Sequence, residues 1–162
     1  MSAPCAAALH EYIGGSRLFD SHTPRSQVDL NRAAAHNRDF RPELRQWIQA
    51  HQGDFGVLDV HSFPGTGDSW NDATANESDL VLLQTMPSDH ESRVVSAVRA
   101  AGFTVAVVAG HPMVNDIVLE ARQSGAKFAL LLEFNESVPM SRLRACCRVI
   151  AKGLAHPPTP IT

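Results

Sequence analysis

The sequence has no apolar run long enough to cross a membrane. Its longest apolar runs, such as residues 105–109 and 128–132, are five residues long, whereas a membrane-spanning helix needs roughly 20. The start of the chain lacks a basic segment followed by a long apolar one, so it does not predict a signal peptide. We therefore expect a cytoplasmic protein that has no membrane partner.

Cysteine is scarce, and its spacing is not that of a disulfide framework. The chain has three cysteines, Cys5, Cys146 and Cys147, two of them adjacent, and it has no C-x-x-C motif. An odd number of cysteines without regular spacing predicts reduced thiols rather than the disulfides of a small secreted domain.

The sequence also lacks a run of like charges. Its formal net charge is -3, and 19% of its residues are charged. This balance gives no reason to expect nucleic acid or an anionic membrane as a partner. With 162 residues, 44% of them hydrophobic, the chain can bury one real core. We predict one α/β domain over residues 1–156 and a loose tail over residues 157–162.

What the sequence does contain is an alternation of strands and helices in its second half. Four apolar runs predict strands at residues 57–61, 80–83, 103–108 and 128–133. Helices are expected between and after them, over residues 88–101, 114–124 and 140–154, the first opened by the capping box Ser88-x-x-Glu91 and ended by Gly102. Continuous apolar strands are typical of a sheet covered on both faces. We therefore predict an α/β fold with a mainly parallel, mixed sheet flanked by helices.

The remaining elements are predicted from shorter patterns. Helices are expected at residues 6–13 and 42–52, and short strands at residues 17–19 and 27–30. Residues 64–79 are expected to form a polar loop. The side chains expected to be buried on the helices include Leu44, Trp47, Ile48, Val94, Val95, Val98, Ala101, Ile117, Val118, Ala121, Leu143, Cys147 and Ile150.

Chemically capable side chains stand at the ends of two predicted strands. Asp59, His61 and Ser62 lie at the end of the first predicted strand, and Glu133 and Asn135 lie at the end of the last one. Ligands of open α/β sheets bind at the carboxyl ends of strands. A neutral imidazole suits zinc, and a nearby carboxylate can act as a general base toward water.

Ordinary structural roles compete with these interpretations. A lone histidine after a strand is more often a satisfied structural residue than a metal ligand. Burying a carboxylate such as that of Glu133 costs several kcal/mol unless it is compensated, but Glu133 could cap a helix or face solvent. Arg32 could hold a substrate carboxylate in a bidentate pair or pair with an aspartate at the surface.

Three short motifs, in order, resemble a known family. They are Asp-Leu-Asn-Arg at residues 29–32, Asp-Val-His-Ser at residues 59–62 and Leu-Glu at residues 132–133. The zinc carboxypeptidase and aspartoacylase superfamily has such elements in this order, and its N-formylglutamate amidohydrolase branch resembles the chain most. Residues 24–32, Ala-Gly-His at 109–111 and Leu-Glu-Phe-Asn-Glu-Ser at 132–137 approach motifs of that branch, although a proline replaces the usual serine at position 24.

The resemblance implies a fold, a reaction and a set of roles. The fold would be of the phosphorylase/hydrolase-like kind found in zinc carboxypeptidases. The reaction would be zinc-assisted hydrolysis of the amide of a small substrate, an N-acyl amino acid with a carboxylate such as N-formylglutamate. His61 would be a zinc ligand and Glu133 the general acid/base. The residues implied to hold or line the substrate are Asn31, Arg32, Arg25 and His111.

One departure from the family pattern concerns the metal. The family supplies further zinc ligands from an early Pro-His-x-Gly or His-x-x-Glu motif, which this chain lacks, and a catalytic zinc usually has three protein ligands. The chain could be truncated at its start, or it could have lost the metal and be a non-catalytic homologue with a carboxylate-binding pocket. It could also recruit another ligand, the candidates being His10, Glu11, His22 and His111.

Overall fold

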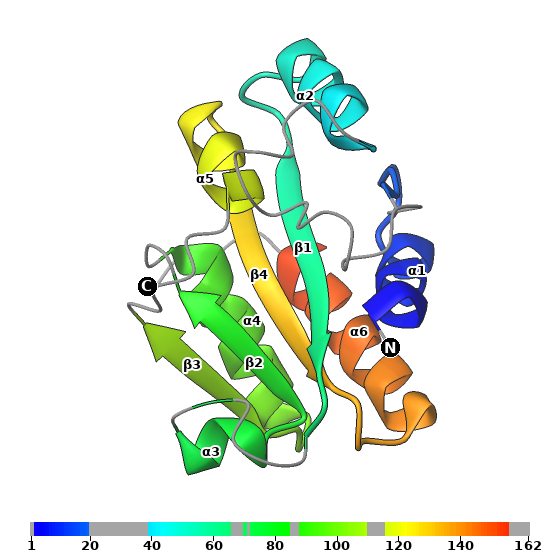
Figure 1. Ribbon diagram of the computed structural model, residues 1–162, viewed down its shortest axis with the longest axis vertical. Coiled ribbons are helices and arrows are strands. Elements are labelled where there is room, and N and C mark those ends of the chain that lie inside the picture. Colours follow the sequence, from blue (N-terminus) through cyan, green and yellow to red (C-terminus); the bar gives the residue numbers. More distant parts are fainter. Residues whose placement is uncertain are drawn as a thin grey trace, which may run out of the picture.

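A four-stranded mixed sheet forms the centre of the protein. The computed structural model describes residues 2–19, 39–65, 70, 72–84, 88–109 and 116–155. Within them the strands are β1 (Gly56–Phe63), β2 (Leu80–Gln84), β3 (Val105–Ala109) and β4 (Phe128–Asn135), in the order β1-β4-β2-β3 (Figure 1). Strands β1 and β4 are parallel, as are β2 and β3, whereas β4 and β2 are antiparallel. The predicted α/β fold with a mixed sheet is therefore confirmed, and the carboxyl ends of β1 and β4 share one edge.

Helices cover both faces of this sheet. On the first face lie α1 (Ser2–Tyr12), α4 (Asp89–Ala100) and α6 (Met140–Ala155), and on the second lie α2 (Arg41–Ala50), α3 (Ala73–Asn76) and α5 (Asp116–Gln123) (Figure 1). Since side chains alternate along a strand, each strand contributes to both cores. In β4, for example, Leu130 and Leu132 join the core on the first face, and Ala129 and Leu131 join the core on the second.

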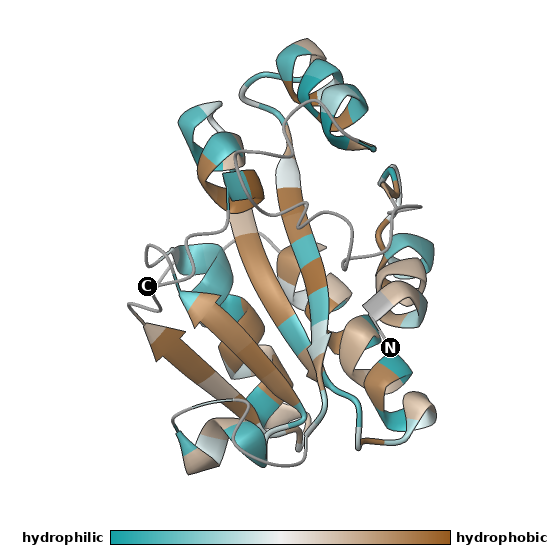
Figure 2. Cartoon of the chain, in the orientation of Figure 1, coloured by the Kyte–Doolittle hydropathy of each residue, from teal (hydrophilic) through white to brown (hydrophobic). Residues whose placement is uncertain are grey.

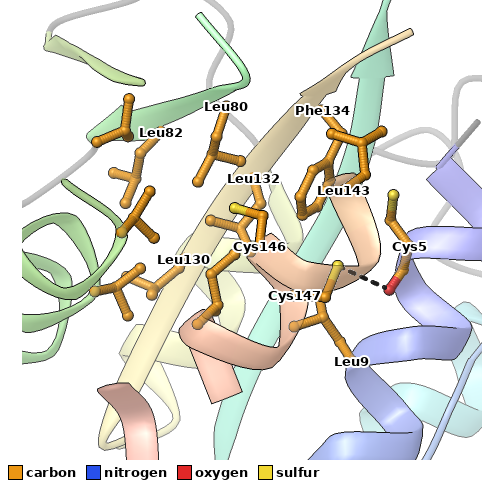
Figure 3. Close-up of a cluster of buried hydrophobic side chains, with 14 of the residues drawn as sticks. Cys5, Leu9, Leu80, Leu82, Leu130, Leu132, Phe134, Leu143, Cys146 and Cys147 are labelled. Carbon is orange, nitrogen blue, oxygen red and sulfur yellow. Dashed lines mark hydrogen bonds between the residues drawn. The ribbon is translucent and has the colours of Figure 1, made fainter. Parts of the chain in front are cut away.

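The core on the first face contains the three cysteines. Cys5, Cys146 and Cys147 are free thiols and fully buried among leucines of β2 and β4 (Figure 3). The Cys147 thiol donates a weak hydrogen bond to the carbonyl oxygen of Cys5 at 3.7 Å, which links α6 to α1. Burial raises the pKa of Cys146 to about 12, so its thiol stays neutral and serves as a small apolar side chain.

Most of the predicted elements are present, with shifted ends. All four strands of the second half form, and Ser88 caps α4 as predicted, because its hydroxyl accepts a hydrogen bond from the Glu91 amide at 3.2 Å. This is the serine half of the predicted capping box, whereas the Glu91 carboxylate accepts from Gln84. The predicted polar loop contains the short helix α3, which Asp72 caps by accepting from the Thr74 amide. The predicted strand at residues 27–30 and the tail lie outside the described residues.

Two predictions are wrong. Residues 17–19 form no strand. Side chains anchor them to α2 instead, because Phe19 packs against the rings of Phe40 and Trp47. Ala101 is exposed rather than buried, because it follows the last helical residue of α4 and the chain turns away at the positive φ of Gly102.

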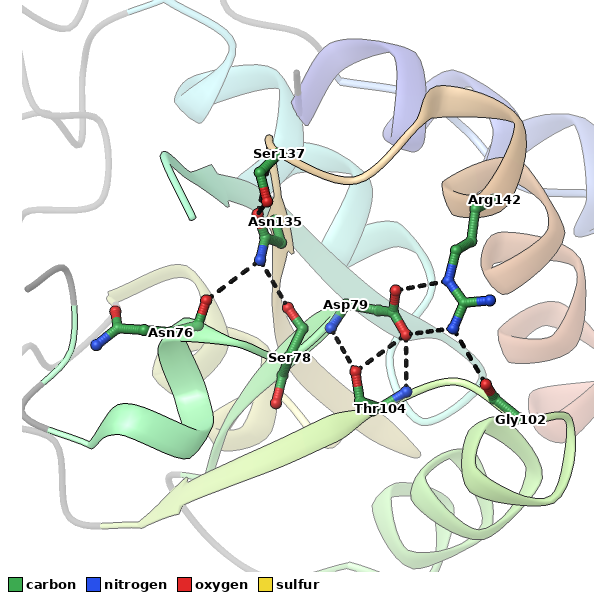
Figure 4. Close-up of polar contacts among 8 residues, drawn as sticks. All are labelled: Asn76, Ser78, Asp79, Gly102, Thr104, Asn135, Ser137 and Arg142. Carbon is green, nitrogen blue, oxygen red and sulfur yellow. Dashed lines mark hydrogen bonds and ion pairs between the residues drawn. The ribbon is translucent and has the colours of Figure 1, made fainter. Parts of the chain in front are cut away.

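A buried carboxylate ties β2, β3 and α6 together. The Asp79 side chain accepts from the Thr104 amide at 2.8 Å and from two nitrogens of Arg142 at 2.7 and 2.8 Å (Figure 4). Burial alone raises the pKa of Asp79, but the hydrogen bonds from Arg142 and Thr104 outweigh it and the net pKa is lowered. The folded state therefore favours the ionised carboxylate.

We expect Asp79→Asn to destabilise the protein at pH 7 and to make no difference in strong acid. The folded-state pKa of Asp79 lies below its unfolded value, so its stabilising effect is present above the unfolded pKa and is lost as pH falls through the folded one. Losing charged hydrogen bonds costs about 1.5–3 kcal/mol. Urea unfolding at a series of pH values measures the difference. A gap between variant and wild type that persists below the folded pKa would contradict this account.

Glu91→Gln is the matched control, and its expected effect on stability at pH 7 has the opposite sign. Glu91 is 3% exposed, and burial raises its pKa, although the Gln84 amide donates to its carboxylate. Ionising Glu91 is therefore unfavourable in the folded state, and that disadvantage appears as pH rises through its folded pKa. The glutamine variant should be more stable than wild type at pH 7 and equal to it below the unfolded pKa of Glu91.

Within the described residues no helix is both long and apolar enough to span a bilayer.

Candidate functional site

His61 and Glu133 lie side by side on the second face of the sheet. They are register partners on the parallel strands β1 and β4, which run about 4.8 Å apart. His61 has the same parity as Val57 and Phe63, and Glu133 the same parity as Leu131, all of which belong to the second core. Both side chains therefore leave the sheet in the same direction, and hydrophilic colours interrupt both apolar strands in Figure 2.

These residues lie inside the strands rather than after them. Both β1 and β4 continue for two residues beyond the positions expected from the apolar runs, to Phe63 and Asn135. Paired residues of the sheet therefore precede and follow both His61 and Glu133. Side chains placed in this way have less freedom than side chains in a loop, which favours a precise arrangement.

Asp59 orients the His61 ring. Its Oδ1 lies 3.0 Å from His61 Nε2, and the two side chains are only 12% and 19% exposed. In the neutral imidazole this bond places the proton on Nε2, because the carboxylate can only accept, and leaves Nδ1 as the acceptor nitrogen. A carboxylate behind one ring nitrogen is the usual second partner of a histidine that binds metal through the other nitrogen.

Glu133 stands between a polar and an apolar neighbour. Its register partners are His61 on β1 and Val81 on β2, and Glu133 itself is only partly exposed. A carboxylate in this position leaves the sheet on the same face as the imidazole and is partly shielded from bulk water. Such a group has the chemistry to accept a proton from water.

The described residues could supply one zinc ligand, but they do not supply a complete set. His61 with Asp59 behind it matches a ligand and its orienting carboxylate. In the described ranges, however, no group of three His, Cys, Asp or Glu side chains is arranged to hold a metal ion. A full set of three ligands would need donors from outside these ranges, where the candidates His22 and His111 lie.

The structure excludes two of the other candidate ligands. His10 and Glu11 belong to α1, which packs on the first face, so the sheet separates them from His61. The His10 ring bonds to the Ser16 hydroxyl at 2.8 Å, and Glu11 pairs with Arg144 at 2.8 Å. Neither can be a metal ligand together with His61.

The substrate-binding residues implied by the resemblance are not placed. Asn31, Arg32, Arg25 and His111 all lie outside the described residues. Their roles therefore stay predictions.

Asn135 and Ser137, from the same motif as Glu133, have structural roles. The Asn135 amide donates to the carbonyl oxygens of Ser78 at 3.0 Å and Asn76 at 3.3 Å, and its oxygen accepts from the Ser137 amide at 2.9 Å (Figure 4). Gly65 passes so close that a Cβ there would lie 1.8 Å from Asn135 Oδ1. Together these contacts fix the turn after β4 and the chain after β1, at the carboxyl ends of the two strands.

A buried arginine at the start of α2 was not predicted from the sequence. Arg41, the first residue of α2, is 1% exposed. Its Nη2 donates to Glu120 Oε2 at 2.9 Å, and Arg45 Nε donates to the other oxygen of Glu120 at 2.7 Å. Burial lowers the pKa of Arg41, partly opposed by the carboxylates of Glu120, Asp116 and Asp59. An arginine beside a proline at a helix start resembles an ordinary surface residue, so pattern reasoning missed it.

The fold is similar to that of a solved hydrolase. No protein-family model matches the sequence, and no curated protein matches it. The crystal structure of N-formylglutamate amidohydrolase from Ralstonia eutropha JMP134 superimposes with a TM-score of 0.50 at 18% sequence identity. The match covers 73% of this chain and 50% of that one, so this chain spans about half the length of its structural neighbour. The protein therefore shares its α/β fold with a hydrolase of that kind.

Proposed function

We propose that the protein is an amidohydrolase of the N-formylglutamate amidohydrolase kind, which hydrolyses the linear amide bond of an N-acyl amino acid. The observation that carries this proposal is the pairing of His61 with Glu133 on one face of β1 and β4. The fold likeness to an N-formylglutamate amidohydrolase supports it independently of the short motifs.

We assign the roles from the motif resemblance, and the arrangement of the two strands supports them. Asp59 holds the His61 ring by its Nε2, so His61 presents Nδ1 as the donor atom to a metal. Zinc, when bound, would lower the pKa of water and polarise the substrate carbonyl. Glu133, beside His61, accepts the proton from the attacking water and delivers it to the leaving amine. The products are the acyl acid and the free amino acid.

The substrate carboxylate is assigned to the Asp-Leu-Asn-Arg segment. Asn31 and Arg32 are proposed to bind it, and Arg25 and His111 to line the pocket, on the basis of the motif resemblance. A guanidinium can hold a carboxylate through two parallel hydrogen bonds, which would fix the acyl carbon near the water.

A second candidate function is a non-catalytic homologue that binds an acidic metabolite without metal. The observation that favours it is the incomplete ligand set, since no three His, Cys, Asp or Glu side chains within the described ranges are arranged to hold a metal ion. This candidate predicts binding of N-formylglutamate that depends on Arg32 and is unaffected by a chelator.

Zinc content and deformylase activity separate the two candidates. We expect the purified protein to bind about one zinc per chain, to release formate from N-formylglutamate, and to lose both properties in His61→Ala, because one of its few ligands is gone. His10→Ala is the matched control, since His10 lies across the sheet, and it should keep both. Protein that takes up no zinc from excess and still binds the substrate through Arg32 would establish the second candidate instead.

A further inference from the structure

The three cysteines of the chain lie in the core on the first face, away from the candidate site. Cys5 belongs to α1, and Cys146 and Cys147 are adjacent on α6 (Figure 3). All three are free thiols and are 0% exposed. A buried thiol usually serves as a small apolar side chain and is chemically inert. The contacts between two of these thiols distinguish them from that ordinary case.

Cys5 and Cys147 lie against each other where α1 packs on α6. The Cys147 thiol donates to the carbonyl oxygen of Cys5 at 3.7 Å, so its sulfur rests on the Cys5 backbone (Figure 3). A hydrogen bond with the Cys147 side chain lowers the pKa of Cys5, although burial opposes this effect, and the same contact together with burial raises the pKa of Cys147. The pair is therefore unequal, because Cys5 gains thiolate character and Cys147 keeps its proton.

Cys146 differs from this pair, although it precedes Cys147 in the chain. Successive residues of a helix point about 100° apart, and the Cys146 side chain lies among leucines of β2 and β4 rather than toward α1 (Figure 3). Burial raises its pKa to about 12. A disulfide between Cys146 and Cys147 would have to close between neighbouring residues of one helix. Cys5 is therefore the partner that the fold offers to Cys147.

We propose that Cys5 and Cys147 form an oxidation site, at which hydrogen peroxide joins them in a disulfide that links α1 to α6. The Cys5 thiolate attacks one peroxide oxygen, which gives the Cys5 sulfenic acid and hydroxide. The Cys147 sulfur then attacks the Cys5 sulfur, the sulfur–sulfur bond forms, and the sulfenic oxygen leaves as water. The two thiols lose two electrons and peroxide gains them, and the two thiol protons end in the two water molecules produced.

Local opening of α1 gives peroxide access to these buried thiols. Among the described side chains of α1, the buried ones are Cys5, Ala8 and Leu9. The ion pair of Glu11 with Arg144, which also joins α1 to α6, is exposed, and exposed ion pairs contribute little to stability. An element with few buried apolar contacts opens at a lower free energy than the whole domain. The thiols are therefore protected while α1 is closed and are reached without global unfolding.

Peptide mass mapping of the folded protein tests the proposal. The reduced protein is treated with hydrogen peroxide, and the remaining free thiols are then alkylated. We expect Cys5 to be linked to Cys147, Cys146 to be alkylated, and dithiothreitol to reverse the link. Cys146→Ser is the matched control and should keep the link at the wild-type yield, whereas Cys147→Ser should lose it. A link from Cys5 to Cys146, links mainly between chains, or thiols that all stay free until the protein unfolds would overturn the proposal.

Oxidation of the wild-type protein in concentrated urea is a control that does not depend on the folding of a variant. In the unfolded chain Cys5 and Cys147 are separated by 142 positions, and nothing holds them together. We expect the yield of the Cys5–Cys147 link, relative to all other links, to be at least about tenfold higher in the folded protein, because a held pair has a high effective concentration. Equal relative yields would show that the fold does not prepare this pair.

The disulfide should also make the folded protein more resistant to heat. A disulfide that closes a long loop stabilises mainly by restricting the unfolded chain, and we expect Tm to rise by about 5–15 °C. Oxidised Cys146→Ser should show the same rise, and reduction should remove it. Linked protein with an unchanged or lower Tm would refute the link as a stabilising connection between α1 and α6. These measurements do not involve deformylase activity, so their outcome is independent of the proposed function.

Discussion

Glu133→Gln is expected to lower the rate of deformylation by about 10²–10⁴-fold, the usual contribution of a general acid–base residue. Glutamine has nearly the same shape, so the strand pairing of β4 with β1 and β2 should not change. It cannot accept the proton of the attacking water. Formate release from N-formylglutamate, compared at equal zinc content, measures the effect.

Glu136→Gln is the matched control for that substitution. Glu136 lies in the same motif, three residues further on, but it is exposed and its carboxylate accepts from the Ser62 hydroxyl at 2.7 Å. Its replacement should change the rate less than about twofold, since surface substitutions away from a site usually have small effects. Equal losses in the two variants, or full activity in Glu133→Gln, would remove Glu133 from the role of base.

Periodicity alone predicted the parts of the fold that depend on burial. Apolar runs such as residues 80–83 and 128–132 indicated strands covered on both faces, and the structure places them in the middle of the sheet. The capping box at Ser88 and the helical spacing of Val94, Val95 and Val98 located α4. These features are local, so a single sequence records them.

Strand direction and neighbours could not be predicted in the same way. No local pattern shows that β4 lies between β1 and β2, or that β2 runs antiparallel to it, because pairing joins segments far apart in the chain. The contact between Asp59 and His61 could have been predicted, since residues two apart share a face of a strand. The ion pairs of Arg41 and Arg45 with Glu120 could not have been predicted. They join helices about 75 residues apart, and the two arginines resemble surface residues in the sequence.

The largest expected loss of stability comes from Leu132→Ala, next to Glu133. Leu132 is fully buried in the first core, and its register partners are Val60 on β1 and Leu82 on β2. Removing such a side chain leaves a cavity that the surrounding strands cannot fill, at a cost of about 2–5 kcal/mol. The whole free energy of unfolding of many domains is only about 5–15 kcal/mol. Equilibrium unfolding in urea measures the change.

Val107→Ala is the comparison on a strand surface, because Val107 lies on β3 and is 37% exposed; it should cost less than about 1 kcal/mol. Leu132 points to the first face, whereas Glu133 points to the second. Leu132→Ala should therefore lower stability and leave the rate per folded molecule within about twofold, provided the assay stays well below the unfolding midpoint. A large loss of rate in protein that is still folded would show that the first core also holds the geometry of His61 and Glu133, and that the two faces of β4 are not independent.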